Sequence, residues 1–160
     1  MKPVAITFTL NGKPVYAAAK PLISARTLLR EQFHLTATKA GCGQGGCGSC
    51  TILVNAEPTL SCLLPAALLD GQDVTTLEGI GSAVNLHPIQ ESFYDNFAAQ
   101  CGYCSSGMIL TAKALLDRNP HPAREEIVSA LSGNLCRCTG YVPIIQAIEE
   151  AAEKLSAVSS

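Results

Sequence analysis

The chain has 160 residues, a formal net charge of -2 at pH 7 and only 15% charged residues against 48% hydrophobic ones. This balance excludes the basic surface that nucleic-acid binding and attachment to anionic membranes require, and no run approaches the roughly 20 apolar residues of a membrane span. The length suits two small domains, each of a size at which a bound metal helps the core. The low charge content predicts a soluble protein with a large interface to a partner, unless abundant alanine and cysteine merely raise the average.

The first predicted element is a β-hairpin. Residues 4–10 alternate apolar and other side chains, Asn11-Gly12 is a strong hairpin-turn signal, and residues 13–19 return as a second strand. The N-terminus lacks the apolar stretch of a signal peptide, so we expect a cytoplasmic protein. In a reducing compartment, eight cysteines are more often metal ligands or redox groups than disulfides.

A helix and a glycine-rich loop come next. Ser24 is a good N-cap for a helix that runs to about Phe33, with Leu28 and Leu29 on its buried side. Residues 41–50 include five glycines and cannot form regular structure.

Short strands and turns complete the first half. The β-branched and apolar runs predict strands at residues 51–54, 59–62 and 74–77, with turns at 55–58 and 70–71. Together with the hairpin they predict a small mixed sheet crossed by one helix. Residues 79–82 have the composition of a hinge, so the expected domains are 1–79 and 80–160.

Helical patterns replace strand patterns in the second half. Pro88 suits the first position of a helix, and Ile89, Phe93 and Phe97 would share one of its faces. Further helices are expected at residues 106–118, 122–131 and 143–155. The second domain is therefore expected to be a four-helix bundle with cysteine pairs at helix ends.

The first cysteine set has the spacing of a plant-type [2Fe–2S] site. Cys42, Cys47 and Cys50 are spaced C-x4-C-x2-C, and Cys62 follows after eleven further residues. Three thiolates on one tight loop can face a compact cluster while the fourth arrives from a neighbouring strand. The surrounding glycines let the backbone take positive φ and turn N–H groups towards the sulfurs, which stabilises an anionic cluster.

Three other interpretations of this loop remain open. Residues 41–46 match G-x-G-x-x-G, but they do not link a βαβ unit. Cys47 and Cys50 could form a dithiol redox pair, or zinc could take the four thiolates. The x4 spacing and the glycine density count against both.

The second cysteine set is a C-x2-C pair and a C-x-C pair separated by thirty-one residues. The C-x-C pair has only one residue between its two cysteines, which is an unusually short spacing for a structural zinc site. The two segments that carry these cysteines are Ala99-Gln100-Cys101-Gly102-Tyr103-Cys104 and Gly133-Asn134-Leu135-Cys136-Arg137-Cys138-Thr139-Gly140-Tyr141. They resemble the Q-C-G-(F/Y)-C and G-N-L-C-R-C-T-G-Y signatures of the small iron–sulfur subunit of the molybdenum hydroxylases, the family of xanthine dehydrogenase, aldehyde oxidoreductase and carbon monoxide dehydrogenase.

The resemblance covers essentially the whole chain and implies an α+β fold. An N-terminal β-grasp, plant-type ferredoxin-like domain would precede an all-α, four-helix-bundle [2Fe–2S] domain. The family pattern assigns an exposed, acceptor-side cluster to Cys42, Cys47, Cys50 and Cys62. It assigns a cluster buried beside the molybdopterin of a large subunit to Cys101, Cys104, Cys136 and Cys138. Gln100 would hydrogen-bond the pterin, and Cys138 would be the ligand nearest to it.

The implied activity is electron transfer without catalytic residues in this chain. Single electrons would pass from molybdenum through both clusters to FAD on a medium subunit or to an external acceptor. The resemblance implies the cytosine dinucleotide form of molybdopterin, and a substrate that is an N-heteroaromatic, such as a purine or nicotinate, or an aldehyde. One alternative is a stand-alone ferredoxin-like carrier, but such a carrier needs a charged docking face, which the low charge content disfavours. Another is an interaction module held together by zinc, which would be colourless.

The chain departs from the family pattern at one place. Family members often have Thr-Pro after the second C-x2-C pair, where this chain has Ser105-Ser106. A serine could cap the helix that starts there, but proline's preset φ is lost. The three histidines are expected in turns or at the surface, and Tyr103 and Tyr141 are expected to pack around the cluster.

Overall fold

A computed structural model describes residues 2–158 of the chain. The hairpin forms as predicted: strand β1 (Val4–Leu10) pairs antiparallel with β2 (Lys13–Ala19), and Leu10 lies opposite Lys13. Asn11 and Gly12 both have positive φ, at 51° and 76°, as a tight primed turn requires.

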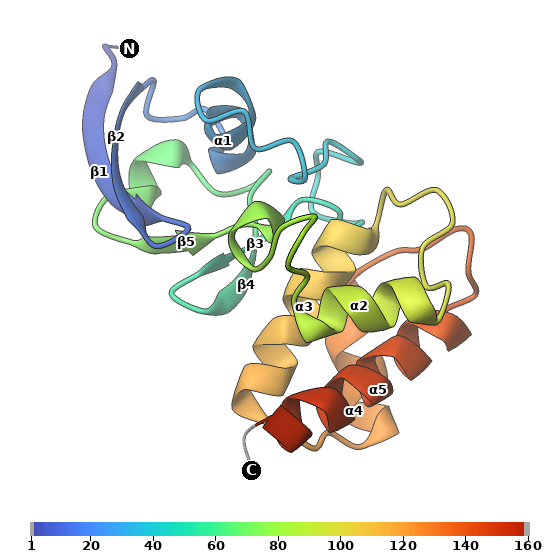
Figure 1. The fold of residues 1–160 in the computed structure, drawn as a ribbon. Coiled ribbons are helices and arrows are strands. Elements are labelled where there is room, and N and C mark those ends of the chain that lie inside the picture. The colour runs from blue at the N-terminus through green and yellow to red at the C-terminus, as the bar shows by residue number, and fades with distance from the viewer. Residues whose placement is uncertain (1, 159–160) are drawn as a thin grey trace.

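The first half is a five-stranded mixed sheet in the order β2-β1-β5-β3-β4 (Figure 1). The remaining strands are β3 (Thr51–Val54), β4 (Glu57–Leu60) and β5 (Asp73–Thr75). β1 and β5 are parallel and the other pairs are antiparallel. Helix α1 (Ala25–Glu31) covers one face of the sheet, and its Leu28 and Leu29 are fully buried with Ile6 and Phe8.

Ser24 caps α1 as predicted, because its hydroxyl accepts a hydrogen bond from the Thr27 N–H. The predicted helix was too long at its end. The helix stops at Glu31, and Phe33 turns back to pack edge-on against Phe8, with ring centroids 5.7 Å apart.

Two strand boundaries differ from the sequence prediction. The turn after β3 contains only Asn55 and Ala56, and Pro58 lies within β4. Proline is tolerated there because β4 is the edge strand of the sheet. Leu77 was predicted to end a strand, but it begins the short 3-10 helix η2 (Leu77–Gly79). A second 3-10 helix, η1 (Ala66–Leu69), had no signal in the sequence.

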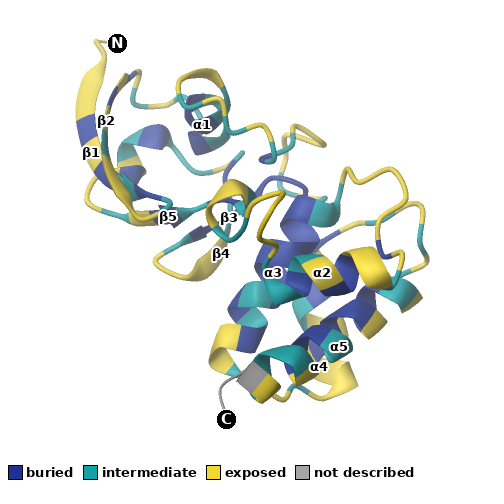
Figure 2. Ribbon diagram, in the orientation of Figure 1, coloured by how far each residue is buried: buried dark blue, intermediate teal, exposed yellow. Residues whose placement is uncertain are grey.

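The second half is helical, so the α+β class is confirmed. It contains α2 (Pro88–Asp95), α3 (Ser105–Arg118), α4 (Arg124–Ala130), η3 (Leu131–Gly133) and α5 (Val142–Val158). Helix α3 is buried along most of its length (Figure 2), because it packs against both the other helices and strand β3. Leu53 of β3 and Leu110 and Ala114 of α3 form a small core between the two halves.

Phe97 does not share a face with Ile89 and Phe93, so that prediction was wrong. Helix α2 ends at Asp95, and Phe97 has a φ of +51° and is 84% exposed. The Asn96 side chain donates to the Ser92 carbonyl and ends the helix, so that Ala98 takes the buried place that Phe97 would have filled.

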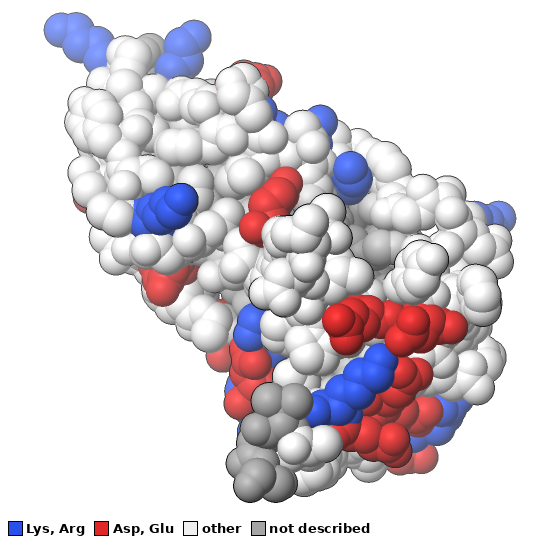
Figure 3. Space-filling model, viewed as in Figure 1, with Lys and Arg blue, Asp and Glu red and all other residues white. Residues whose placement is uncertain are grey.

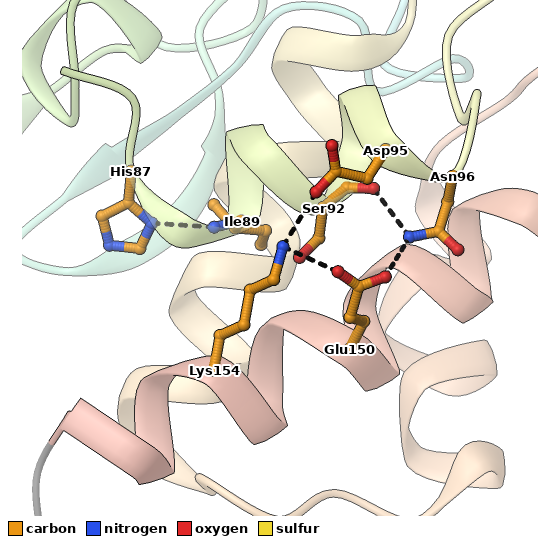
Figure 4. Close-up of polar contacts among 7 residues, drawn as sticks. All are labelled: His87, Ile89, Ser92, Asp95, Asn96, Glu150 and Lys154. Atoms are coloured by element: carbon orange, nitrogen blue, oxygen red, sulfur yellow. Dashed lines mark hydrogen bonds and ion pairs between the residues drawn. The ribbon is translucent and has the colours of Figure 1, made fainter.

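Charged side chains gather on the face formed by α2 and α5, while much of the remaining visible surface carries none (Figure 3). Lys154 lies 3.0 Å from Asp95 and 2.7 Å from Glu150, and Asn96 also donates to Glu150 (Figure 4). The hydrogen bond from Lys154, followed by the one from Asn96, lowers the pKa of Glu150.

His87 is the N-cap of α2, and its Nδ1 accepts a hydrogen bond from the Ile89 N–H. Within residues 2–158, no helix has both the length and the apolar character to cross a membrane.

Candidate metal centres

The first cysteine set lies on the loop between α1 and β3 and at the end of β4. Gly43, Gly45 and Gly48 have φ values of +69°, +82° and +68°, as expected for a loop that folds its backbone around a cluster. The N–H groups of Gln44 and Gly46 point at the Cys42 sulfur, at 3.5 and 3.3 Å. The Gln44 N–H, followed by the Cys47 thiol, lowers the pKa of Cys42 to about 7, which favours the thiolate.

Cys50 and Cys62 form the second pair of this set. Cys50 is buried, and burial raises the pKa of its thiol. Interaction with the neighbouring Cys62 thiol raises this pKa further. The Ser61 hydroxyl donates to the Cys50 carbonyl at 2.6 Å and holds the end of β4 against the loop. Cys62 itself lies in the turn that follows β4, two residues beyond the end of the strand.

The second cysteine set also meets in pairs. The Sγ atoms of Cys138 and Cys101 are 3.7 Å apart, and Cys104 interacts with Cys136. Burial, followed by the hydrogen bond with Cys136, raises the pKa of Cys104 to about 12. Binding of a metal must therefore displace a proton from this thiol.

The C-x-C segment is shaped by residues that the sequence did not single out for this role. The Thr139 hydroxyl lies 3.1 Å from the Cys136 sulfur, and the Thr139 N–H donates to the same atom. The Tyr141 hydroxyl accepts from the Cys136 N–H and donates to the Asn134 carbonyl, both at 3.0 Å. These two hydrogen bonds let the Tyr141 side chain position the segment, and the residue itself has a φ of +69°.

The pairing of the thiols fits a binuclear cluster. Within the described residues, no three metal-ligating side chains meet in a group that could hold one ion. Two thiolates about 2.3 Å from one tetrahedral metal would have sulfurs about 3.8 Å apart, close to the 3.7 Å between Cys101 and Cys138. A [2Fe–2S] cluster with four cysteine ligands takes two on each iron, whereas a structural zinc gathers four around one point. The donor sets therefore fit [2Fe–2S] clusters.

Family comparisons agree with this geometry. A family model described as "2Fe-2S iron-sulfur cluster binding domain" matches residues 8–76, and one described as "[2Fe-2S] binding domain" matches residues 76–149. The nicotinate dehydrogenase small FeS subunit of Eubacterium barkeri is 46% identical over 154 residues, which cover 96% of this chain and 98% of that protein. The chain belongs to the small iron–sulfur subunits of the molybdenum hydroxylases.

Other relatives support the same assignment. A nicotinate dehydrogenase subunit of Pseudomonas putida is 48% identical over 148 residues, covering 92% of this chain and 94% of that protein. The crystal structure of quinoline 2-oxidoreductase from Pseudomonas putida 86 matches with a TM-score of 0.93 and 43% identity, covering 98% of each chain. As a small iron–sulfur subunit, this chain is the electron-transfer subunit of an oxidoreductase.

In this iron–sulfur subunit two cysteines of the second set, the outer cysteines Cys101 and Cys138, are exposed to solvent. Gln100 beside them is exposed as well, whereas Cys50 of the first set is buried. The expected order of burial, with the second site the deeper one, is therefore not a property of the chain alone. Any burial of this site must come from a partner.

The expectation that a serine caps α3 was wrong. Cys104 occupies the N-cap position, and the hydroxyls of Ser105 and Ser106 are buried without a hydrogen-bond partner among the described residues. The first turn of α3 packs under the glycine loop, where a Cβ on Gly107 would lie 2.3 Å from the Gly48 carbonyl oxygen. This tight packing encloses the serine hydroxyls and gives them no acceptor.

Replacing Ser106 with proline should stabilise the holoprotein by about 1 kcal/mol. Proline suits the first turn of a helix, lowers the entropy of the unfolded chain and removes a buried, unpaired hydroxyl. The measurement is the urea midpoint for cluster loss, read from visible absorbance. Ser132→Pro, in the 3-10 helix η3, is the control and should destabilise. A lower midpoint for Ser106→Pro would contradict the argument.

Proposed function

We propose that this subunit carries two [2Fe–2S] clusters and relays electrons between them. Residues 1–79 would form the β-grasp domain and residues 80–160 the four-helix-bundle domain. What supports the division is the change from one family match to the other at residue 76 and the separate apolar core of each half. The ligands would be Cys42, Cys47, Cys50 and Cys62 for one cluster and Cys101, Cys104, Cys136 and Cys138 for the other.

The second cluster would face a large molybdopterin-binding subunit. Its support is a set of exposed apolar side chains that lie close in sequence to the outer cysteines: Tyr94 (79% exposed), Phe97 (84%), Tyr103 (46%), Leu135 (57%) and Val142 (54%). Exposed apolar side chains of this size, so close in sequence to ligands, are typical of a surface that a partner covers. Gln100 and Cys138 would then contact the pterin, in its cytosine dinucleotide form.

The backbone offers a short route between the two ligand sets. The Leu135 N–H donates to the Cys47 carbonyl at 3.0 Å, and Leu135 is bonded directly to Cys136. A ligand of one set is thereby joined to a ligand of the other through one hydrogen bond and a few covalent bonds. A [2Fe–2S] cluster supplies one-electron transfer when bound. The protein contributes N–H donors to Cys42 and hydrogen bonds to Cys136 that stabilise negative charge on these sulfurs.

The substrate of the whole enzyme would be an N-heteroaromatic such as nicotinate. Two relatives at 48% and 46% identity are named as nicotinate dehydrogenase subunits, and quinoline, also an N-heteroaromatic, is named for a solved relative. Purines and aldehydes are the other candidates from the family. Electrons would leave the exposed Cys42 side towards FAD on a medium subunit or an external acceptor, and the complex would be cytoplasmic.

The test is affinity purification of this chain from its own cells with any bound partners, followed by anaerobic addition of nicotinate, quinoline, a purine or an aldehyde. We expect about four iron and four sulfide per chain, two S = 1/2 EPR signals on reduction, and bleaching by nicotinate without added reductant. Bleaching by another substrate alone would move the assignment to that class. Clusters without a co-purifying large subunit would indicate a free carrier, and a colourless zinc protein would overturn the proposal.

A further inference from the structure

A buried asparagine joins the two cysteine loops. Asn134 is 5% exposed and lies two residues before Cys136. Its Nδ2 donates to the carbonyl of Gly48 at 3.2 Å, and its Oδ1 accepts from the Thr111 hydroxyl of α3 at 3.0 Å. One side chain thus connects the ferredoxin-type loop, the C-x-C loop and the central helix.

The backbone beside this side chain is paired as well. Leu135 donates to the carbonyl of Cys47, so the consecutive residues Asn134 and Leu135 hold the consecutive carbonyls of Gly48 and Cys47. The Gly48 carbonyl also accepts from the N–H and the hydroxyl of Thr51, at 3.0 and 2.7 Å. The loop carbonyl therefore stays paired without Asn134, but the asparagine supplies the side-chain hydrogen bond that, with the backbone bond from Leu135, ties this loop to the second loop.

The three elements meet without space to slide. A Cβ on Gly48 would lie 2.5 Å from the Gly133 carbonyl oxygen and 2.6 Å from the Asn134 Nδ2. A Cβ on Gly107 would lie 2.3 Å from the Gly48 carbonyl oxygen. A carboxamide both donates and accepts in such a space, which neither a carboxylate nor an aliphatic side chain of similar size can do.

We infer that Asn134 is a positioning residue that sets the separation, and hence the electronic coupling, of the two clusters. The inference rests on the proposed pair of clusters. Asn134 acts through its neighbours in the two loops, because it binds Gly48, which follows Cys47, and lies two residues before Cys136. Because one-electron transfer weakens steeply with distance, a small slip of one loop past the other slows the relay while both ligand sets remain complete.

The test is Asn134→Leu in the complex with the large subunit. Iron, sulfide and both individual EPR signals should match the wild type. The magnetic interaction between the two reduced clusters, measured by low-temperature EPR, should change. Inter-cluster electron transfer after substrate addition should slow severalfold. Asn85→Leu, an exposed asparagine, is the matched control and should change neither quantity.

Thr111→Val is the second variant, in case Asn134→Leu loses a cluster. It removes only the hydroxyl that orients the asparagine and should change the cluster interaction in the same direction by a smaller amount. An unchanged magnetic interaction in a fully loaded Asn134→Leu or Thr111→Val protein would overturn the inference. A wild-type protein with only one EPR signal would instead overturn the proposed function.

Discussion

Replacing Cys104 with alanine is expected to remove the helical-domain cluster and to stop reduction of the remaining cluster by substrate. Cys104 is half-buried at the start of α3 and pairs with Cys136, so no exposed thiol can take its place. Iron should fall from about four to about two per chain, because each [2Fe–2S] cluster accounts for two. The measurement is iron and sulfide analysis with EPR of the protein reduced first by substrate and then by dithionite.

The reciprocal variant is Cys50→Ala, which should remove the ferredoxin-type cluster and leave the other reducible by substrate. Cys50 is the buried member of its set and directly precedes β3, so its truncation also leaves a small cavity. The two variants should each retain the EPR signal that the other lacks. Substrate-driven reduction that survives Cys104→Ala would show that electrons enter through the ferredoxin-type site, contrary to the proposed order.

Replacing Gly107 with alanine is expected to destabilise the protein by about 3 kcal/mol. In an exposed helix the same change would stabilise by about 1 kcal/mol, because alanine is the better helix former. Here the added Cβ would meet the Gly48 carbonyl oxygen at 2.3 Å and approach the Asn134 side chain, so the helix and the glycine loop must separate. Urea unfolding, with visible absorbance to follow the clusters, measures the effect.

Gly133→Ala provides the matched control. A Cβ there would meet no atom within 4 Å, and no positive φ is required of Gly133, so its stability should change little. A Gly107→Ala protein as stable as the wild type would show that the contact between α3 and the loop relaxes easily. That result would also weaken the argument that Asn134 holds a rigid joint.

The local structure of the chain could be predicted well where short-range physics decides it. The β1–β2 hairpin follows from alternating side chains around Asn11-Gly12, and α1 begins directly after Ser24 because the serine hydroxyl caps a free N–H group. The ends of the helices and strands were predicted less accurately. Phe33 leaves α1 to pack on Phe8, and Phe97 leaves the line of α2 because Asn96 ends that helix. Both outcomes depend on contacts that no local pattern records.

The eight cysteines, their spacings and their family signatures are properties of the sequence, because a C-x4-C-x2-C loop or a C-x-C bite restricts which metal centres a short segment can hold. Their meeting in pairs, the exposure of Cys101 and Cys138, and the unpaired hydroxyls after Cys104 were decided only by the tertiary structure. The same holds for the joint at Asn134, which lies 86 residues from the Gly48 carbonyl it binds. Contacts at such separation exist only once the two cores are packed against each other.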